Sequence, residues 1–90
     1  MSSLMRVASV PLASVRRPLQ RFLDEAKVEA LMTSIAQEGL REPIDLLEVK
    51  GQLWGFNGCH RVAAHERLGL PTIRARIRQA TPRDLNLHLR

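Results

Sequence analysis

Cysteine and aromatic residues are scarce in this sequence. Its 90 residues include one cysteine, Cys59, and three aromatic side chains, Phe22, Trp54 and Phe56, with no tyrosine. A single cysteine excludes a disulfide within the chain, which fits a reducing compartment and makes the cytoplasm the expected location. The few aromatic residues leave aliphatic side chains to form the core and provide no aromatic platform for stacking bases.

Long apolar runs are absent as well. No stretch approaches the roughly 20 apolar residues that a membrane-spanning helix requires. Residues 1–10 contain a single arginine and no extended apolar segment, so they do not resemble a secretory signal. We therefore expect no association with a membrane.

Positive charge comes almost entirely from arginine. The chain has 12 arginines against two lysines, and its formal net charge is +5. The planar arginine fork matches phosphate and carboxylate groups better than the lysine ammonium does. A basic surface of this kind fits a nucleotide, a nucleic acid or an acidic protein partner, while many single arginines serve only solubility. Charge alone leaves these alternatives open.

The spacing of apolar residues predicts one small α+β (or α/β) domain over residues 1–90, with about four strands and three helices. Strands are expected at residues 5–10, 44–49, 53–56 and 72–78, and helices at about 25–38, 59–68 and from 82 onward. Residues 1–9 are either flexible or include the short first strand. Asp24 and Thr81 are positioned to cap the first and last helices.

The last predicted strand alternates between apolar and arginine side chains. Its apolar residues are Ile73, Ala75 and Ile77, and its basic residues are Arg74, Arg76 and Arg78. Because successive side chains of a strand point to opposite faces, we expect one face of this strand to be buried and the other to be strongly basic.

The segment 56–61, Phe-Asn-Gly-Cys-His-Arg, places the only cysteine at the predicted start of a helix. Gly58 permits a sharp turn from strand to helix and the close approach of a ligand. The helix N-terminus, Arg61 and His60 all favour the thiolate of Cys59, and the same N–H groups suit a phosphate. The sequence therefore predicts a nucleophile beside a phosphate site, although a lone cysteine is more often a small buried apolar residue.

Three further charged residues are candidates on weaker grounds. Lys27 lies in the first turn of a predicted helix, where a cation is disfavoured unless it has a ligand or partner. Arg17 precedes a proline in a rigid segment, and Asp45 interrupts an apolar strand. Each is also explained as a solvated or ion-paired side chain. No metal site is predicted, because one cysteine and scattered histidines lack a closely spaced ligand set.

These residues together resemble the sulfiredoxins, ATP-dependent reductases of cysteine-sulfinic acid. The resemblance extends from about Val10 to Arg90, and the sequence features are most similar to those of the cyanobacterial and chloroplast members. It rests on Arg17-Pro18-Leu19, residues 24–35, Pro43-Ile44-Asp45, residues 56–61 and Leu70-Pro71-Thr72-Ile73. It implies the small fold that sulfiredoxins share with the N-terminal domain of the ParB partition proteins.

The resemblance implies a reaction that uses ATP with Mg²⁺ and repairs an over-oxidised 2-Cys peroxiredoxin. The sulfinate of that partner would attack the γ-phosphate and become a sulfinyl phosphate ester. The thiolate of Cys59 would displace phosphate and form a thiosulfinate between the two proteins. Thioredoxin or glutathione would resolve this bond, because a chain with one cysteine has no second thiol. A monomer that docks transiently is expected, in the cytoplasm or, for a processed plant or algal form, in the chloroplast stroma.

The resemblance also implies which residues form the catalytic and phosphate-binding centre. Cys59, His60 and Arg61 would be the catalytic residues. Gly58 would join these three in cradling the phosphates of ATP. Asp45 would orient Arg61, so that the guanidinium is aimed at the γ-phosphate.

Other positions would bind the rest of the nucleotide or depart from the family pattern. Lys27 and Arg17 would reach the nucleotide or its phosphates, and Ser34 would contact the adenosine part. Asn57 stands where many members have a second glycine, and Val62 stands where an aromatic residue is usual. Ala30 stands where relatives often carry serine, so a hydrogen bond to the nucleotide would be missing there. The change at Val62 affects part of the pocket wall or the partner contact, while the cysteine is intact.

The rival interpretation is a ParB-like domain that binds or cleaves nucleic acid. Arg74, Arg76 and Arg78 would then follow a phosphate backbone. This interpretation is disfavoured because a cysteine replaces the acidic residue of the Gly–acidic–Arg–Arg block in ParB proteins, and no helix-turn-helix domain follows. A third interpretation is a non-catalytic adaptor on peroxiredoxin, for which Cys59 would be dispensable.

Overall fold

The computed structural model describes residues 5–18 and 22–88. In chain order the elements are β1 (Met5–Pro11), the 3-10 turn η1 (Leu12–Ser14), β2 (Val15–Arg16), α1 (Glu25–Glu38), β3 (Ile44–Val49), β4 (Gln52–Gly55), α2 (Cys59–Arg67), β5 (Thr72–Gln79) and α3 (Pro82–His88). The predicted α+β fold and its three helices are confirmed. Residues 1–4 of the uncertain N-terminal segment and Leu19 of the resemblance lie outside the described residues.

The sheet has five strands rather than the four that were predicted. The additional strand, β2, is only two residues long and lies between Pro11 and Pro18. An alternating pattern cannot be recognised in two residues, and two flanking prolines are typical of irregular structure. The sequence therefore predicted the segment as a connection, whereas Val15 and Arg16 pair with β4.

Strand order in the mixed sheet is β1-β5-β3-β4-β2. β5 runs antiparallel to β1 and parallel to β3, and β4 runs antiparallel to β3. The hairpin between β3 and β4 turns through Lys50 and Gly51, whose φ angles of 51° and 78° suit a two-residue turn. Because β3 and β5 are parallel, the chain must return along the sheet between them, and β4 and α2 make that return.

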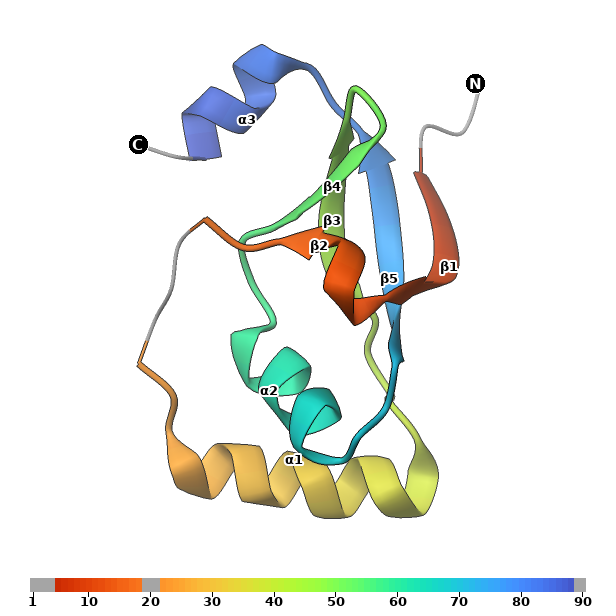
Figure 1. Cartoon of the computed structure of the whole chain (residues 1–90), viewed down its shortest axis with the longest axis vertical. Helices are drawn as coiled ribbons and strands as arrows, with labels where there is room; N and C mark the ends of the chain where they lie inside the picture. Colours follow the sequence, from red (N-terminus) through yellow and green to blue (C-terminus); the bar gives the residue numbers. More distant parts are fainter. Residues whose placement is uncertain (1–4, 19–21, 89–90) are drawn as a thin grey trace.

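α2 lies between α1 and the sheet (Figure 1). Its Val62 packs into the buried cluster on the sheet, whereas Ala63 and Ala64 pack into the cluster shared with α1. With His65 only 4% exposed, four consecutive residues of α2 are buried. The helix is thus enclosed on two sides, which fixes the position of its first residue, Cys59.

The alternation predicted for β5 is confirmed. Its three alternating apolar residues are at most 1% exposed and belong to the buried cluster on the sheet. On the opposite face, Arg76 is half-buried, and Arg74 and Arg78 are exposed. The face of the sheet that points away from α2 therefore presents a row of guanidinium groups.

Both predicted helix caps are confirmed. The side chain of Asp24 accepts hydrogen bonds from the N–H groups of Ala26 (3.0 Å) and Lys27 (3.3 Å) at the start of α1. Thr81 and Asp84 form a reciprocal pair at the start of α3, with the Asp84 carboxylate 3.0 Å from the Thr81 nitrogen and the Thr81 hydroxyl 3.2 Å from the Asp84 nitrogen. These caps satisfy N–H groups that a helix cannot bond internally.

An ion pair joins the first turn of α1 to the last turn of α2. Arg67 Nη1 lies 2.6 Å from Glu25 Oε1, and Nη2 lies 3.1 Å from Oε2. This hydrogen-bonded contact with Arg67 lowers the pKa of Glu25 below its ordinary value. Each charge also has the sign that its helix end favours, since Glu25 is at an N-terminus and Arg67 at a C-terminus. The pair therefore connects the start of α1 to the end of α2 at the surface of the molecule.

α3 lies at the end of the molecule remote from α1 and contacts β3 (Figure 1). Within residues 5–18 and 22–88, none of the helices combines the length and the apolar composition needed to cross a bilayer. At the end opposite α3, the start of α1 lies beside the start of α2, since the backbone nitrogen of Asp24 contacts His60.

Candidate active site

The turn that leads into α2 consists of Asn57 and Gly58. Gly58 has a left-handed backbone (φ 73°, ψ 20°), and no side chain caps the helix that follows it. A Cβ at Gly58 would lie 2.6 Å from Cγ2 of Ile44, so the position requires glycine on both conformational and steric grounds. The turn therefore sits directly on the first residue of β3. The backbone N–H groups at the start of α2 have no side-chain cap and lie beside the half-buried Cys59. Such groups are suited to bind an anion.

His60 links the starts of the two helices. Its Nε2 lies 3.0 Å from the backbone nitrogen of Asp24, and a backbone N–H can only donate. Nε2 is therefore the acceptor, and in the neutral ring the proton is on Nδ1. Nδ1 lies 3.7 Å from Sγ of Cys59. A neutral His60 thus directs an N–H group toward the sulfur, an arrangement that suits a thiolate nucleophile.

Arg61 is held by backbone carbonyl groups. Its Nη1 donates to the carbonyl oxygens of Glu42 (3.0 Å) and Pro43 (3.2 Å), in the connection that precedes β3. Within the part of the chain that the structure describes, no carboxylate pairs with this guanidinium. Carbonyl dipoles fix the position of the group without neutralising its charge, so the full positive charge is available to an anion.

The prediction that Asp45 orients Arg61 is wrong. Asp45 Oδ1 accepts from Nε of Arg76 at 2.9 Å, and Oδ2 lies 3.4 Å from Nη2 of the same side chain. Asp45 and Arg76 are direct neighbours in the register of β3 and β5. Because both side chains project from the same face of adjacent strands, this pairing forms without any displacement of the backbone. The carbonyl groups of Glu42 and Pro43 take the place that was predicted for Asp45.

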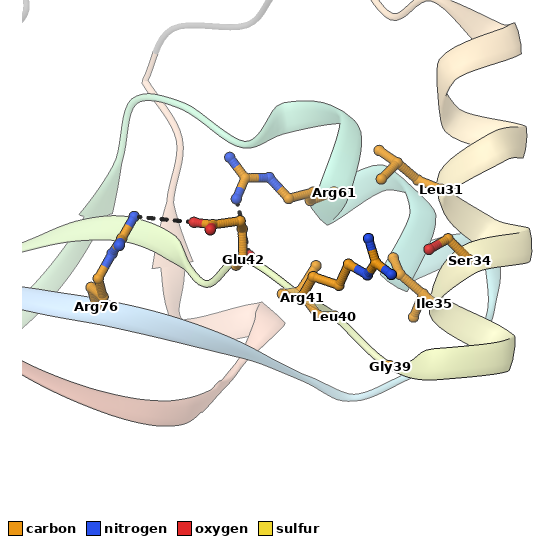
Figure 2. A pocket seen from close by; sticks show the side chains of 9 residues that line it. All are labelled: Leu31, Ser34, Ile35, Gly39, Leu40, Arg41, Glu42, Arg61 and Arg76. Carbon is orange, nitrogen blue, oxygen red and sulfur yellow. Dashed lines mark hydrogen bonds and ion pairs between the residues drawn. The ribbon is translucent and has the colours of Figure 1, made fainter.

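A pocket of about 340 Å³ lies beside Arg61, between α1 and the connection from α1 to β3 (Figure 2). Its lining comprises Leu31, Ser34, Ile35, Gly39, Leu40, Arg41, Glu42, Arg61 and Arg76. Two predicted site residues, Ser34 and Arg61, thus face one cavity from different helices. The lining combines apolar side chains of α1 with three guanidinium groups, which suits a ligand that has both an apolar and an anionic part.

Lys27 and Arg17 do not line this pocket. Lys27 is exposed in the first turn of α1, three residues after Asp24, whose backbone contacts His60. Arg17 is half-buried and directly follows β2. Neither side chain forms an ion pair with an acidic residue in the described ranges. The link through Asp24 and His60 brings the first turn of α1, and with it Lys27, next to the start of α2.

The predictions missed most of the residues that surround Ser34 and Arg61. Leu31 and Ile35 have the helical spacing of core residues, so the sequence offered no sign that they also line a cavity. Arg76 was identified only as one of three equivalent arginines. Its position directly opposite Asp45 in the sheet register sets it apart, and that register was not predictable without the strand order.

Within residues 5–18 and 22–88, no group of three or more His, Cys, Asp or Glu side chains could hold a metal ion.

Comparison with known proteins identifies the family. A family model described as the ParB N-terminal domain matches residues 2–90. A sulfiredoxin of Arabidopsis thaliana, named as chloroplastic/mitochondrial, is 52% identical over 86 residues, which cover 93% of this chain and 69% of that protein. The crystal structure of Arabidopsis sulfiredoxin superimposes with a TM-score of 0.92 at 52% identity and covers 94% of this chain and 98% of that one. The chain belongs to the sulfiredoxins, within the ParB N-terminal domain family.

Two further relatives fit this assignment. The sulfiredoxin of Saccharomyces cerevisiae is 30% identical over 116 residues, covering 98% of this chain and 91% of that protein. A C-terminally truncated ParB from Caulobacter crescentus matches with a TM-score of 0.67 and 26% identity over 83% of this chain and 45% of that one. Sulfiredoxins reduce the sulfinic acid of peroxiredoxins. The prediction of an antioxidant oxidoreductase is therefore confirmed, and the ParB-like alternative is less well supported.

Proposed function

We propose that the protein reduces the cysteine-sulfinic acid of an over-oxidised 2-Cys peroxiredoxin with ATP as co-substrate. The observation that carries this proposal is the position of Cys59, whose sulfur faces Nδ1 of His60 at the uncapped start of α2. The oxygen of a sulfinate must become a leaving group before a thiolate can attack the sulfur. The reaction therefore needs a nucleophilic thiol beside a phosphate site, and a helix N-terminus that begins with cysteine offers both.

The pocket beside Arg61 supports nucleotide binding. Its volume of about 340 Å³ is within the range of small-ligand sites. The adenosine part would occupy this cavity against the apolar side chains of α1, with Ser34 bonded to a hydroxyl group. The phosphates would extend to Arg61 and to the N–H groups at the start of α2, where Gly58 permits close approach. Lys27 and Arg17 would add positive charge around the phosphates.

Magnesium would enter with the nucleotide. Mg²⁺ in phosphate-binding sites usually keeps several water molecules and takes phosphate oxygens together with few protein ligands. The described residues include no preformed cluster of acidic or histidine ligands. We therefore propose that phosphate oxygens and water supply most of the coordination of the ion.

The reaction would proceed in three steps. A sulfinate oxygen of peroxiredoxin attacks the γ-phosphorus of ATP, so that a sulfinyl phosphate forms and ADP leaves. The thiolate of Cys59 then attacks the sulfinyl sulfur, forming a thiosulfinate as the S–O bond breaks and phosphate leaves. His60 and Arg61 would hold the thiolate and the phosphoryl group in place during these steps. An external thiol attacks the Cys59 sulfur, releasing the partner as a sulfenic acid and leaving a mixed disulfide that a second thiol reduces.

The third step requires a thiol reductant from outside the chain. Because Cys59 is the only cysteine, the chain has no resolving thiol. Thioredoxin or glutathione would supply the reductant, which fits a reducing compartment such as the cytoplasm or the chloroplast stroma. The protein would act as a monomer that docks transiently on peroxiredoxin.

Intact mass of a sulfinylated 2-Cys peroxiredoxin tests this function. After incubation with the protein, ATP, Mg²⁺ and a thiol, we expect the sulfinic form to disappear, with the loss of at least one oxygen mass because thiol reduces the sulfenic product further, and no change when ATP or the protein is omitted. If thiol is omitted, a species that links the two proteins should accumulate. Unchanged sulfinate, with a folded protein and an active reference sulfiredoxin assayed in parallel, would exclude the function for that substrate and make nucleic-acid binding the next assay.

Lys27→Ala is expected to weaken ATP binding about 10-fold. A hydrogen bond between an ammonium group and a phosphate contributes roughly 1.5–3 kcal/mol, and the exposure of Lys27 places its effect at the lower end. The dissociation constant for ATP, measured by calorimetry with Mg²⁺ present, reports the effect. Lys50→Asn is the matched control, because the hairpin turn that contains Lys50 lies at the end of the molecule remote from α1 (Figure 1). Equal losses in both variants would mean that Lys27 contributes only general charge.

A further inference from the structure

Arg76 is the arginine of β5 that forms ion pairs. Its guanidinium binds Asp45 through two nitrogens, at 2.9 and 3.4 Å, and lies 3.8 Å from a carboxylate oxygen of Glu42. Arg74 and Arg78 project from the same face of the same strand, and neither forms an ion pair within residues 5–18 and 22–88. The three arginines are therefore equivalent in sequence but not in structure.

The contact with Asp45 continues to the turn that precedes the reactive cysteine. Oδ2 of Asp45 accepts from the side-chain amide of Asn57 at 3.5 Å, and the Asn57 side-chain oxygen lies 3.4 Å from the backbone nitrogen of Asp45. Asn57 thus exchanges two hydrogen bonds with one residue of β3. It is followed directly by Gly58 and Cys59, so its side chain ties the turn to the sheet.

A second contact leads from Arg76 to the segment that holds Arg61. Figure 2 shows the carboxylate of Glu42 between the guanidinium groups of Arg76 and Arg61. The side chain of Glu42 faces Arg76, while its carbonyl oxygen accepts from Arg61 at 3.0 Å. One guanidinium on the open face of β5 is therefore connected to two segments of the site, to the turn before Cys59 through Asp45 and to the connection that binds Arg61 through Glu42.

We propose that Arg76 is a positioning residue, which acts through Asp45 and Asn57 to hold the turn that presents Cys59. The planar fork of arginine fixes both oxygens of the Asp45 carboxylate and so sets the direction from which Oδ2 meets Asn57. Arg76 also lines the pocket. Its charge, however, is already paired with two carboxylates, so it is less suited to bind a phosphate than the unpaired guanidinium of Arg61.

A double-mutant cycle with Arg76→Gln and Asn57→Ala tests this inference. We expect each single variant to lower the single-turnover rate of sulfinate reduction, at saturating ATP, by about 10-fold, because small displacements of a reacting group have large kinetic effects. If Arg76 acts through Asn57, the double variant should also lose about 10-fold rather than about 100-fold. The dissociation constant for ATP should change little. Arg74→Gln, which removes the same charge from the same face, should leave both quantities unchanged.

A second readout keeps the inference separate from the proposed function, on which it rests only for the turnover assay. The alkylation rate of Cys59 by iodoacetamide, followed by intact mass without ATP or peroxiredoxin, should fall several-fold in Arg76→Gln and in Asn57→Ala, and no further in the double variant. Exposed ion pairs add little to stability, so the unfolding midpoint should be nearly the same in all variants. Independent, multiplying effects on rate, or a loss of ATP affinity confined to Arg76→Gln, would overturn the positioning role.

Discussion

Cys59→Ser is expected to reduce sulfinate repair to less than about one thousandth of the wild-type rate, while ATP binding stays unchanged. Cys59 carries the only thiol in the sequence, and a serine hydroxyl at the same position stays protonated. The replacement is close to isosteric and leaves the N–H groups at the start of α2 in place. The Cys59→Ser variant should therefore bind ATP normally but fail to reduce the sulfinate.

The measurement is intact mass of a sulfinylated peroxiredoxin, combined with calorimetry of ATP binding. The species that links the two proteins should be absent from Cys59→Ser even when thiol is omitted. A control, Ser14→Ala, removes a hydroxyl that donates to the carbonyl oxygen of Pro11 at the end of β1 and should behave as wild type. Full activity of Cys59→Ser would show that the protein is an adaptor rather than a nucleophilic enzyme.

Gly58→Ala is expected to destabilise the protein by about 2–5 kcal/mol and to lower activity of the folded fraction by about 100-fold. The destabilisation combines a left-handed backbone at φ 73° with a Cβ only 2.6 Å from Cγ2 of Ile44. Because Ile44 is fully buried, its side chain has little room to move away, and we expect the first turn of α2 to shift instead. Such a shift would displace Cys59, and displacements of about 1 Å are enough for losses of this size.

Gly69→Ala provides a matched control for this prediction. Gly69 has the same φ of 73°, but a Cβ there would meet no atom within 4 Å. It should therefore show only the backbone cost, about 1–2 kcal/mol, and keep its activity. Denaturant unfolding gives the two stabilities, and the single-turnover rate of sulfinate reduction gives the activities. Equal effects of the two substitutions would mean that the contact with Ile44 has no influence on the site.

Most of the secondary structure was predictable because it depends on local signals. Helix α1 was predicted over the residues that it occupies, since Asp24 and Gly39 mark its ends and its apolar residues have helical spacing. The alternation in β5 identified both its buried and its basic face. β2 was missed because two residues contain no period, and its pairing with β4 is decided by tertiary contacts.

The grouping of residues at the centre of the candidate site was predictable from the sequence, and the contacts around it were not. Gly58, Cys59, His60 and Arg61 are consecutive, so one segment of sequence already brings them together. Their supports come from distant parts of the chain, namely the Asp24 nitrogen for His60 and two carbonyl groups for Arg61. Backbone atoms have no sequence signature, which is why a side chain, Asp45, was wrongly predicted as the partner of Arg61.

The enclosure of α2 between α1 and the sheet limits how the two proteins can meet. The four consecutive residues 62–65 are all buried, so the helix cannot rotate or slide toward a partner without exposing apolar surface on two sides. Cys59, at the start of this helix, is half-buried. A docking partner would therefore have to bring its sulfinate to the position that the enclosed helix sets for this thiol.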